Sequence, residues 1–280
     1  MGKKKILIIT GITGFIGSEV VLNNKFLDDY KILGLNSKNF FLLTKELEII
    51  SKNKFFKIVQ KSDHVDILHL ATFYDLNEES KEKIYNSNYL FGKKFFQDLI
   101  NYDIKLLNIL YTNTVFSFSS DTRINNSTYV KSKNEFSKFL DEFANDSNIN
   151  FNEIFLSNTI GINDFRDKLI PNMVSSLKLE KSLNLENPNL FINILDIDII
   201  INEIYSLLQS NNNAKYSFLS KKEYLISSIN SYLTSYLKEN IKNKIEFRIS
   251  NLGDSFSSEI KIKYFDFDLE KILDEISENT

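Results

Sequence analysis

The chain has no cysteine and no tryptophan, and it has only two histidines, two prolines and eight glycines among its 280 residues. The absence of cysteine excludes disulfides and thiolate metal sites. His64 and His69 are the only imidazoles, and no cluster of carboxylates accompanies them in the sequence, so we expect no metal centre. The net charge of −3 argues against a nucleic-acid partner, because binding to phosphates usually requires a basic face.

Long apolar runs are also missing, since none approaches the roughly 20 residues of a membrane span. Three lysines at positions 3–5 precede a short apolar run, a pattern that imitates a signal peptide. The run leads into Gly11-Ile12-Thr13-Gly14 and not into a cleavage site. We therefore expect a cytoplasmic protein with no membrane contact. Its length suits one large domain, or one domain with a smaller lobe.

The first half of the chain alternates short apolar runs with helical patterns, which is typical of βαβ units and a parallel sheet. The apolar runs predict strands at Lys5–Thr10, Tyr30–Asn36, Phe55–Val59, Val65–Ala71, Ile104–Val115 and Asn150–Leu156. The helical patterns predict helices at Phe15–Lys25, Glu78–Tyr102 and Thr128–Asn145. The fold class that follows is α/β, with a Rossmann-type doubly wound parallel sheet.

The regular alternation fades after Gly161. The later elements that we expect are strands at Phe191–Leu195, Lys244–Ile249 and Glu259–Tyr264, and helices at Asp196–Gln209, Lys222–Leu237 and Asp268–Ile276. Pro171 and Pro188 flank a segment that we expect to leave the main sheet. We therefore predict a Rossmann domain over residues 1–160, to which residues 189–210 return. Residues 161–188 and 211–280 then form a small C-terminal α/β lobe.

A glycine-rich turn, Thr10–Gly17, lies between the first predicted strand and the first predicted helix, and it holds three of the eight glycines. A dinucleotide pyrophosphate needs backbone N–H donors at a helix N-terminus, and glycines let the backbone approach closely. The spacing is GxxGxxG and not GxGxxG, and a plain strand-to-helix turn is the alternative interpretation. The predicted cofactor-binding residues of the turn are Gly11, Thr13, Gly14, Phe15, Ile16 and Gly17.

The choice between NAD and NADPH is made at the end of the second predicted strand, where an acidic residue would bind the ribose 2′-OH of NAD. That place holds Asn36, Ser37 and Lys38. No carboxylate repels a 2′-phosphate there, and Lys38 with the Ser37 hydroxyl can bind one. NADPH is therefore the expected cofactor and NAD the second choice. The alternative is that all three are ordinary loop residues.

Tyr129 and Lys133 are a phenol and an ammonium at positions i and i+4 of a predicted helix, so they share one helix face. A phenol with a pKa of about 10 is a poor acid at neutral pH, and a nearby cation brings that pKa closer to the working range. Tyr89 and Lys93 have the same spacing, but they lie inside a helix with an apolar face. Tyr129 instead follows the strand that carries Thr112, and ligands of parallel sheets bind at the carboxyl ends of strands.

These elements, in this order, resemble the extended short-chain dehydrogenase/reductases, the NAD-dependent epimerase/dehydratase family. The resemblance spans Lys5–Leu208. Its motifs are the glycine turn, His69-Leu70-Ala71-Thr72, Asn88 with Gly92, Thr112 with Tyr129 and Lys133, Asn158 before Thr159-Ile160-Gly161, and Asp196 before a helix.

The resemblance implies roles for these residues. Tyr129 exchanges a proton with a sugar hydroxyl or ketone, Lys133 binds the cofactor ribose, and Thr112 binds the reacting oxygen. Further cofactor contacts are implied for Leu70, Ala71, Thr72 and Asn88. Asn158 is expected to contact the nucleotide diphosphate of the substrate, so the C-terminal lobe becomes the expected substrate-binding lobe. A homodimer built on the helices Glu78–Tyr102 and Thr128–Asn145 is also implied, unless their aromatic faces only cover the sheet.

Within the family, His69–Tyr74 and Thr112-Asn113-Thr114 look most like CDP-abequose and CDP-paratose synthases, which are reductases acting at C4 of CDP-4-keto-6-deoxy-glucose. Tyr74 and Asn113 are accordingly predicted to contact the substrate. Sugar 4,6-dehydratases carry acids where this chain has Asn113 and Thr114, so dehydration is disfavoured. Asn189 stands where the family often has an arginine on the diphosphate, and Lys168 is the candidate to supply that charge.

Three functions remain in competition. The first is NADPH-dependent reduction of the 4-keto group of a nucleotide-activated 6-deoxyhexose for surface polysaccharide synthesis. The second is a nucleotide-sugar 4-epimerase with tightly bound NAD, which usually has the acidic residue missing at Asn36. The third is a non-catalytic dinucleotide sensor, which the presence of both Tyr129 and Lys133 argues against.

Overall fold

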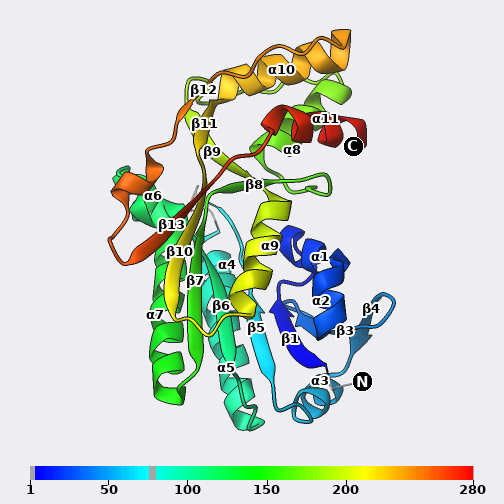
Figure 1. Cartoon of the computed structure of the whole chain (residues 1–280), viewed down its shortest axis with the longest axis vertical. Helices are drawn as coiled ribbons and strands as arrows, with labels where there is room; N and C mark the ends of the chain where they lie inside the picture. The colour runs from blue at the N-terminus through cyan, green and yellow to red at the C-terminus, as the bar shows by residue number, and fades with distance from the viewer. Residues whose placement is uncertain (1–3, 76–79, 280) are drawn as a thin grey trace. The chain divides into compact units, whose positions relative to one another are not determined.

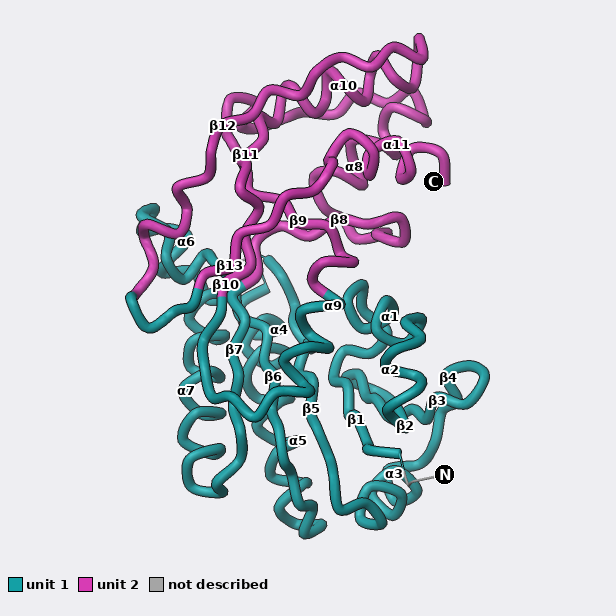
Figure 2. Tube along the Cα trace, viewed as in Figure 1, with its two compact units in different colours: residues 1–155, 201–216, 258–261 teal, residues 156–200, 217–257, 262–280 magenta. Residues whose placement is uncertain are grey.

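The computed structural model of the chain describes residues 4–75 and 80–279 (Figure 1). The chain forms two compact units (Figure 2). Unit 1 comprises residues 1–155, 201–216 and 258–261, and unit 2 comprises residues 156–200, 217–257 and 262–280. These units differ from the predicted domains in four segments. Residues 156–160 and 189–200 belong to unit 2, and residues 211–216 and 258–261 belong to unit 1.

The sheet of unit 1 has four parallel strands at its middle. These are β2 (Tyr30–Leu35), β1 (Lys5–Thr10), β5 (Val65–His69) and β6 (Asn108–Thr114). The sheet continues past β6 with β7 (Asn150–Leu156), β10 (Ala214–Ser220) and β13 (Ile260–Phe265), and the chain passes between the units within β10 and β13. The predicted Rossmann-type α/β fold is confirmed.

Helices cover both faces of this sheet (Figure 1). On one face, α3 (Lys52–Val59), α5 (Phe91–Asn101) and α7 (Thr128–Ser147) contribute side chains to the largest core cluster described in unit 1. On the other face lie α1 (Phe15–Leu22), α2 (Asn24–Asp29) and α9 (Ile197–Leu208). The rings of Phe26 in α2 and Tyr205 in α9 meet edge to face, with 5.3 Å between their centroids.

The predicted strand at Phe55–Val59 is wrong, because these residues belong to α3. Phe55, Phe56 and Val59 are fully buried at positions i, i+1 and i+4, which is a helical spacing that a short apolar run cannot distinguish from a strand. Ser51 caps the helix by accepting a hydrogen bond from the N–H of Lys54.

The edge of the sheet beyond β2 is an antiparallel hairpin of β3 (Phe40–Leu43) and β4 (Leu47–Ile50). The sequence predicted no element between residues 37 and 54, where the structure has this hairpin. Phe41, Leu42 and Ile50 are buried and attach the hairpin to the core.

Two other predicted helices of unit 1 are interrupted. The helix predicted at Phe15–Lys25 divides at Asn23, whose backbone is extended and whose side chain accepts from the N–H of Lys25 to cap α2. The helix predicted at Glu78–Tyr102 begins at Glu78, which lies outside the described residues. The described part contains α4 (Lys81–Tyr85), a π-helical turn η1 (Asn86–Leu90) and α5.

Unit 2 is built on a four-stranded sheet in the order β12-β11-β9-β8. Its strands are β12 (Phe247–Ile249), β11 (Lys222–Leu225), β9 (Phe191–Asp196) and β8 (Asn158–Ile160). The helices α8 (Leu169–Lys178), α10 (Ile226–Glu239) and α11 (Leu269–Asn279) pack with this sheet around a core that includes Met173, Ile194 and Leu233.

The helix predicted at Lys222–Leu237 begins instead as β11, which pairs antiparallel with β9 and β12. Glu223 is buried there because the guanidinium of Arg248 on β12 binds its carboxylate at 2.6 Å. The pairing of β11 with strands on both sides is a tertiary interaction that the local helical pattern does not reveal. Of the helices described for this chain, none has the length and apolarity required to cross a membrane.

Candidate cofactor and active site

The glycine turn is folded against the loop that follows β5. Gly11 has φ of 72°, in the left-handed region, and a Cβ there would lie 2.9 Å from the backbone N of Ala71. Gly17, in α1, is equally confined, because its Cβ would lie 2.5 Å from the carbonyl O of Gly11. Gly14 precedes α1 and offers no side-chain cap to the first-turn N–H groups. An uncapped helix N-terminus behind a close-packed glycine turn fits the pyrophosphate of a dinucleotide.

Thr10, the last residue of β1, fixes the neighbouring loop. Its hydroxyl oxygen accepts hydrogen bonds from the backbone N–H groups of Leu70 and Ala71, both at 3.2 Å. The backbone of Leu70 also donates to the carbonyl of Thr10 at 3.1 Å. Two segments predicted to bind the cofactor are therefore adjacent, at the carboxyl ends of β1 and β5.

Asn88 holds the continuation of that loop from the π-helical turn η1. Its amide oxygen accepts from the hydroxyl of Thr72 at 3.1 Å and from the N–H of Phe73 at 2.6 Å. Its amide nitrogen donates to the carbonyl of Phe73 at 3.1 Å and to the hydroxyl of Ser132, on α7, at 3.3 Å. The buried Asn88 thus joins the loop to the helix that carries Tyr129. Its predicted contact with the cofactor stays a prediction.

The three residues predicted to select the cofactor follow β2. The side-chain oxygen of Asn36 accepts from the backbone N–H groups of Lys38 and Asn39, both at 2.9 Å, and so shapes the loop. Ser37 and Lys38 are exposed. The described loop between β2 and β3 carries no carboxylate, and the roles of Asn36, Ser37 and Lys38 toward a ribose stay predictions.

Thr112, Tyr129 and Lys133 are all buried in unit 1. Thr112 lies near the end of β6, where its hydroxyl donates to the carbonyl of His69 at 3.3 Å. Tyr129 is in the first turn of α7, which Ser127 caps by accepting from the N–H of Val130. The ammonium Nζ of Lys133 lies 5.9 Å from the centroid of the Tyr129 ring. The fold therefore brings the predicted phenol and cation together.

Tyr74 packs against Tyr129 of this pair. Its ring meets that of Tyr129 edge to face, with 5.0 Å between centroids, and it also approaches Phe116. Burial, and then the charge of Asp75, raise the pKa of Tyr74, so this phenol stays protonated at neutral pH. Its position is compatible with the predicted substrate contact.

Asn113 is buried, and its amide is bound by groups of the interior. Successive residues of a strand face opposite sides of the sheet, so Asn113 and Thr112 diverge. The amide of Asn113 donates to Glu153 Oε1 at 2.7 Å and to Asn134 Oδ1 at 3.2 Å, and accepts from the N–H of Thr114 at 2.8 Å. This geometry disfavours the predicted contact between Asn113 and the substrate.

Sequence reasoning missed Glu153, a carboxylate on β7 with 1% of its surface exposed. Burial raises its pKa, against hydrogen bonds from Ser137 and Asn113 and the charges of Lys215 and Lys133. Burial also lowers the pKa of Lys133 to about 7, while Glu153 opposes this shift. An acidic residue inside a predicted buried strand was the signal that could have found it.

His69 is buried beside the same lysine, with its ring 4.6 Å from that of Phe136. Neither ring nitrogen has a hydrogen-bond partner in the described part of the chain. Burial, and then the charge of Lys133, lower the pKa of His69 to about 3, so the imidazole is neutral. His69 serves as a packing residue under Tyr111 and Phe136.

Two predicted substrate ligands, Asn158 and Lys168, lie in unit 2. Asn158 is on β8, and its amide donates to the carbonyl of Asn193 at 3.0 Å. Burial, and then Arg166, lower the pKa of Lys168 to about 8. Arg166, which sequence reasoning also missed, binds the buried carboxylate of Asp164 at 2.6 Å. The contacts of Asn158 and Lys168 with a substrate stay predictions.

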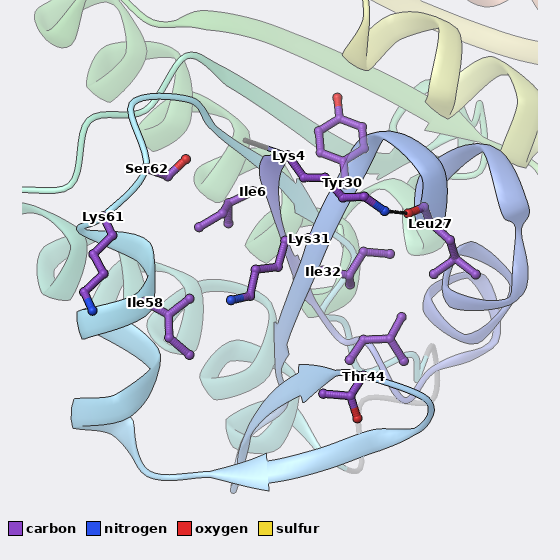
Figure 3. Close-up of a pocket in the computed structure, with 11 residues that line it drawn as sticks. Lys4, Ile6, Leu27, Tyr30, Lys31, Ile32, Thr44, Ile58, Lys61 and Ser62 are labelled. Carbon is purple, nitrogen blue, oxygen red and sulfur yellow. Dashed lines mark hydrogen bonds between the residues drawn. The ribbon is translucent and has the colours of Figure 1, made fainter. Parts of the chain in front are cut away.

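A cavity of about 650 Å³ opens elsewhere on unit 1, at the amino ends of β1 and β2 (Figure 3). Its lining includes Lys4, Tyr30, Lys31, Thr44, Lys61 and Ser62. No predicted site residue is among its lining residues. It lies at the sheet edge opposite the glycine turn, whereas ligands of parallel α/β sheets bind at the carboxyl edge.

A known protein family and several solved structures resemble this chain. The NAD dependent epimerase/dehydratase family matches residues 7–191. No curated protein matches the chain.

Solved structures resemble the whole chain. One is a UDP-glucuronic acid 4-epimerase from Bacillus cereus in complex with NAD, with a TM-score of 0.73 and 14% identity, covering 98% of this chain and 95% of that one. Another is a UDP-N-acetylglucosamine 4-epimerase from Methanobrevibacter ruminantium in complex with UDP-N-acetylmuramic acid, with a TM-score of 0.71 and 19% identity, covering 99% and 98%. At such identities the likeness establishes the fold alone.

Proposed function

Because the chain belongs to the NAD-dependent epimerase/dehydratase family, we propose that it uses NADPH to reduce the 4-keto group of a nucleotide-activated 6-deoxyhexose. The observation that carries this proposal is the Tyr129–Lys133 pair, held on α7 beside the carboxyl end of β6. Supply of the reduced sugar for surface polysaccharide synthesis is part of the proposal.

The residues around the glycine turn fit a dinucleotide. Gly11 and Gly17 leave a close-packed cradle that a Cβ would fill, and the first turn of α1 has no side-chain cap. Backbone N–H groups of residues 13–17 would hold the pyrophosphate. Residues 70–72 would line the cofactor, Lys133 would bind its nicotinamide ribose, and residues 36–38 would bind the adenosine ribose. When bound, the cofactor supplies the hydride for the carbonyl carbon.

Residues of this chain would donate the proton to the substrate and compensate the negative charge that remains. Tyr129 would donate its phenolic proton to the ketone oxygen, and the ammonium of Lys133 would compensate the charge left on Tyr129. Thr112 would turn its hydroxyl from the carbonyl of His69 toward the reacting oxygen. Asn113 and Thr114 cannot act as acid and base, so the site does not support elimination of water.

Unit 2 carries in Lys168 a cation suited to a sugar-nucleotide diphosphate. Lys168 carries an ammonium at the start of α8, and Arg166 lies two residues before it. We assign the diphosphate to Lys168, together with the amide of Asn158. The CDP form of the nucleotide rests only on the resemblance of residues 69–74 and 112–114 to CDP-abequose and CDP-paratose synthases.

A 4-epimerase that keeps NAD bound is the second candidate, favoured by the names of the similar structures. The two functions differ in cofactor turnover, because an epimerase regenerates its cofactor within each cycle and a reductase consumes it.

The decisive experiment incubates purified protein with NADPH and CDP-4-keto-6-deoxy-glucose and follows loss of nicotinamide absorbance. We expect one NADPH consumed per sugar reduced. Parallel incubations with UDP-glucose and UDP-N-acetylglucosamine, followed by chromatography, test epimerisation. Epimerised product, together with NAD that remains bound through dialysis, would refute the reductase and support the epimerase.

A further inference from the structure

The cavity of about 650 Å³ at the amino ends of β1 and β2 has no part in the proposed reaction (Figure 3). Tyr30, Lys31 and Ile32 of β2 all line it. Because successive residues of a strand face opposite sides of the sheet, a space that touches three in a row reaches around the edge of β2. Its volume is within the range of about 300–1,000 Å³ that is usual for small-molecule sites.

The edge of β2 is open there because β3 leaves it. In the described strands, the pairing of β2 with β3 ends at Leu33 and Leu42. Leu43 and Thr44, which come next, line the cavity. The turn beyond them is fixed by the N–H of Thr44, which donates to the carbonyl of Glu46 at 3.1 Å. The gap therefore comes from the course of the backbone.

Apolar side chains from several elements cover the inner part of the cavity. Ile6 of β1 is 4% exposed, and Ile32 of β2 is 1% exposed. Leu27 of α2, Leu43 of β3 and Ile58 of α3 are half-buried and also line the space. An apolar group that enters it is therefore removed from water.

The charged groups of the lining all have the same sign. Lys4, Lys31 and Lys61 line the cavity, and no carboxylate is among its described lining residues. The chain as a whole has a net charge of −3, so this local excess of cations runs against the overall balance. Like charges around one space repel one another, and an anion between them relieves that repulsion.

Two of these ammonium groups remain available to an anion. Nζ of Lys4 donates to the carbonyl of Leu27 at 2.6 Å, and this neutral partner leaves the charge of Lys4 uncompensated. The side chain of Lys31 points from β2 toward Ile58 of α3 (Figure 3). Lys31 has no hydrogen-bond or ion-pair partner among the described residues.

Two negative features nearby do not cancel these charges. Helix α3 ends just before Lys61, and a helix C-terminus carries about half a negative charge. Glu48 of β4 accepts a hydrogen bond from the hydroxyl of Thr44 at 2.5 Å, but it is exposed and outside the lining. Together these amount to about one and a half negative charges against three positive ones, so the cavity stays cationic.

We propose that this cavity is a second ligand site, which binds a small organic anion with an apolar body. The apolar body lies against Ile32 and Ile58, and the acid group is bound by Lys31 with Lys4. The site goes beyond the proposed reaction, because it is at the amino ends of β1 and β2, whereas the glycine turn follows the carboxyl end of β1.

The first test titrates the protein with 8-anilinonaphthalene-1-sulfonate, an aromatic anion that fluoresces in apolar surroundings, while saturating NADPH occupies the dinucleotide site. Lys31→Glu should weaken binding of the dye about tenfold or more, because it replaces an attraction by a repulsion. The matched control is Lys57→Glu, the same charge change at an exposed residue of α3 outside the lining, and it should have little effect. Equal affinities of the wild type and Lys31→Glu would overturn the proposal.

Displacement of the dye separates the possible ligands. Decanoate and decyl phosphate carry the two candidate acid groups, and the more effective of the two identifies the preferred one. Decanol has the same apolar body without a charge, and it should require a concentration about tenfold higher or more. Displacement by decanol at the same concentration as the acids, or no displacement by either acid, would refute the site.

The wild type itself shows where the ligand binds, which covers the case in which Lys31→Glu does not fold. The δ1 methyl groups of isoleucine are labelled with ¹³C for NMR, and Ile58→Val and Ile100→Val identify two of the signals. Adding the more effective acid should shift the Ile58 signal and leave that of Ile100, which is 61% exposed on α5 outside the lining. An unmoved Ile58 signal would place the ligand elsewhere and end the proposal.

These measurements are independent of the sugar substrate. If the acid shifts Ile58 but the wild type reduces no keto-sugar, the reductase function fails and the second site stands. If the wild type reduces the sugar and Ile58 does not respond, the second site fails alone.

Discussion

Two tyrosine–lysine pairs with the same spacing occupy helices of unit 1, and only one of them lies at the carboxyl end of a strand. Tyr129 is beside Lys133 and Tyr74 near the end of β6. Tyr89 receives a hydrogen bond from Lys93 at 3.4 Å and packs on Phe136 in the core. The chemistry thus depends on where the fold places the pair, and the spacing alone does not reveal it.

Tyr129→Phe should lower kcat by about 10²–10⁴-fold, because general acid catalysis is worth that much. Binding of NADPH, measured by fluorescence titration, should remain. Tyr89→Phe is the matched control, since it removes the same hydroxyl from the same spacing, and it should retain turnover. Near-wild-type turnover in Tyr129→Phe would remove this residue from the mechanism.

Asn36→Asp should reverse the cofactor preference. A carboxylate can accept the two backbone hydrogen bonds that Asn36 accepts from Lys38 and Asn39, so the loop should keep its shape. We expect the wild type to prefer NADPH over NADH by about tenfold in kcat/KM, which is about 1.4 kcal/mol. Lys38 alone would contribute less, since an exposed ion pair is worth about 0.2–1 kcal/mol.

The same substitution at Asn23 is the control, because Asn23 also accepts a backbone hydrogen bond but caps α2. Asn23→Asp should leave the ratio of kcat/KM values unchanged. A variant Asn36→Asp that still prefers NADPH would show that the preference has another origin.

At the scale of elements, short runs rich in apolar residues predicted β1, β2, β5, β6 and β7, and the run of β1 is almost continuously apolar, as expected of a strand buried on both faces. The apolar pattern could not distinguish the strands of the β3–β4 hairpin from the helix α3, since a run of about four apolar residues fits a strand or a helix. The segment of β11 was predicted as helix. Its strand conformation depends on pairing with β12, whose Arg248 binds Glu223, and β12 is distant in sequence.

The residues of the candidate site also include some that the sequence predicted and some that it did not. Tyr129 and Lys133 were predictable because both lie on one helix. The contact between Glu153 and Asn113 was not predictable. It depends on β7 lying beside β6 and on both side chains lying on the same face of the sheet.

Gly17→Ala tests the element that opens the cofactor site. The added Cβ would lie 2.5 Å from the carbonyl O of Gly11 and 2.8 Å from Cα of Ile12, so α1 must shift from the turn. We expect NADPH affinity to fall at least tenfold in fluorescence titration. Overpacking should also cost about 1–3 kcal/mol in urea unfolding.

Leu22→Ala, at the exposed end of the same helix, should change neither measurement appreciably. Unchanged affinity in Gly17→Ala would mean that the N-terminus of α1 does not hold the dinucleotide.

At the scale of the whole molecule, the predicted homodimer can bury only those side chains that remain exposed on the two predicted interface helices. The aromatic faces of α5 and α7 are largely occupied, because Phe95, Phe96 and Phe136 are buried in unit 1. Leu90, at the junction of η1 and α5, remains 45% exposed. Ile100, on α5, is 61% exposed. A dimer built on these helices would therefore depend on Leu90, on Ile100 and on polar contacts.

Light scattering should show a mass near twice 32.6 kDa at micromolar concentration. Leu90→Glu should return the protein to the monomer mass, whereas Leu22→Glu, at an exposed leucine of α1, should not. A wild type that shows only the monomer mass would dispose of the dimer.

The interleaving of the two units has a consequence for how the protein is made and cut. Unit 1 takes its pieces from residues 1–155, 201–216 and 258–261. On the ribosome, its sheet is therefore incomplete until residues 258–261 have been synthesised, and β7 remains an unpaired edge until β10 emerges. No single scission of the backbone yields either unit whole, so dissection of this enzyme calls for a rewired chain order and not for truncation.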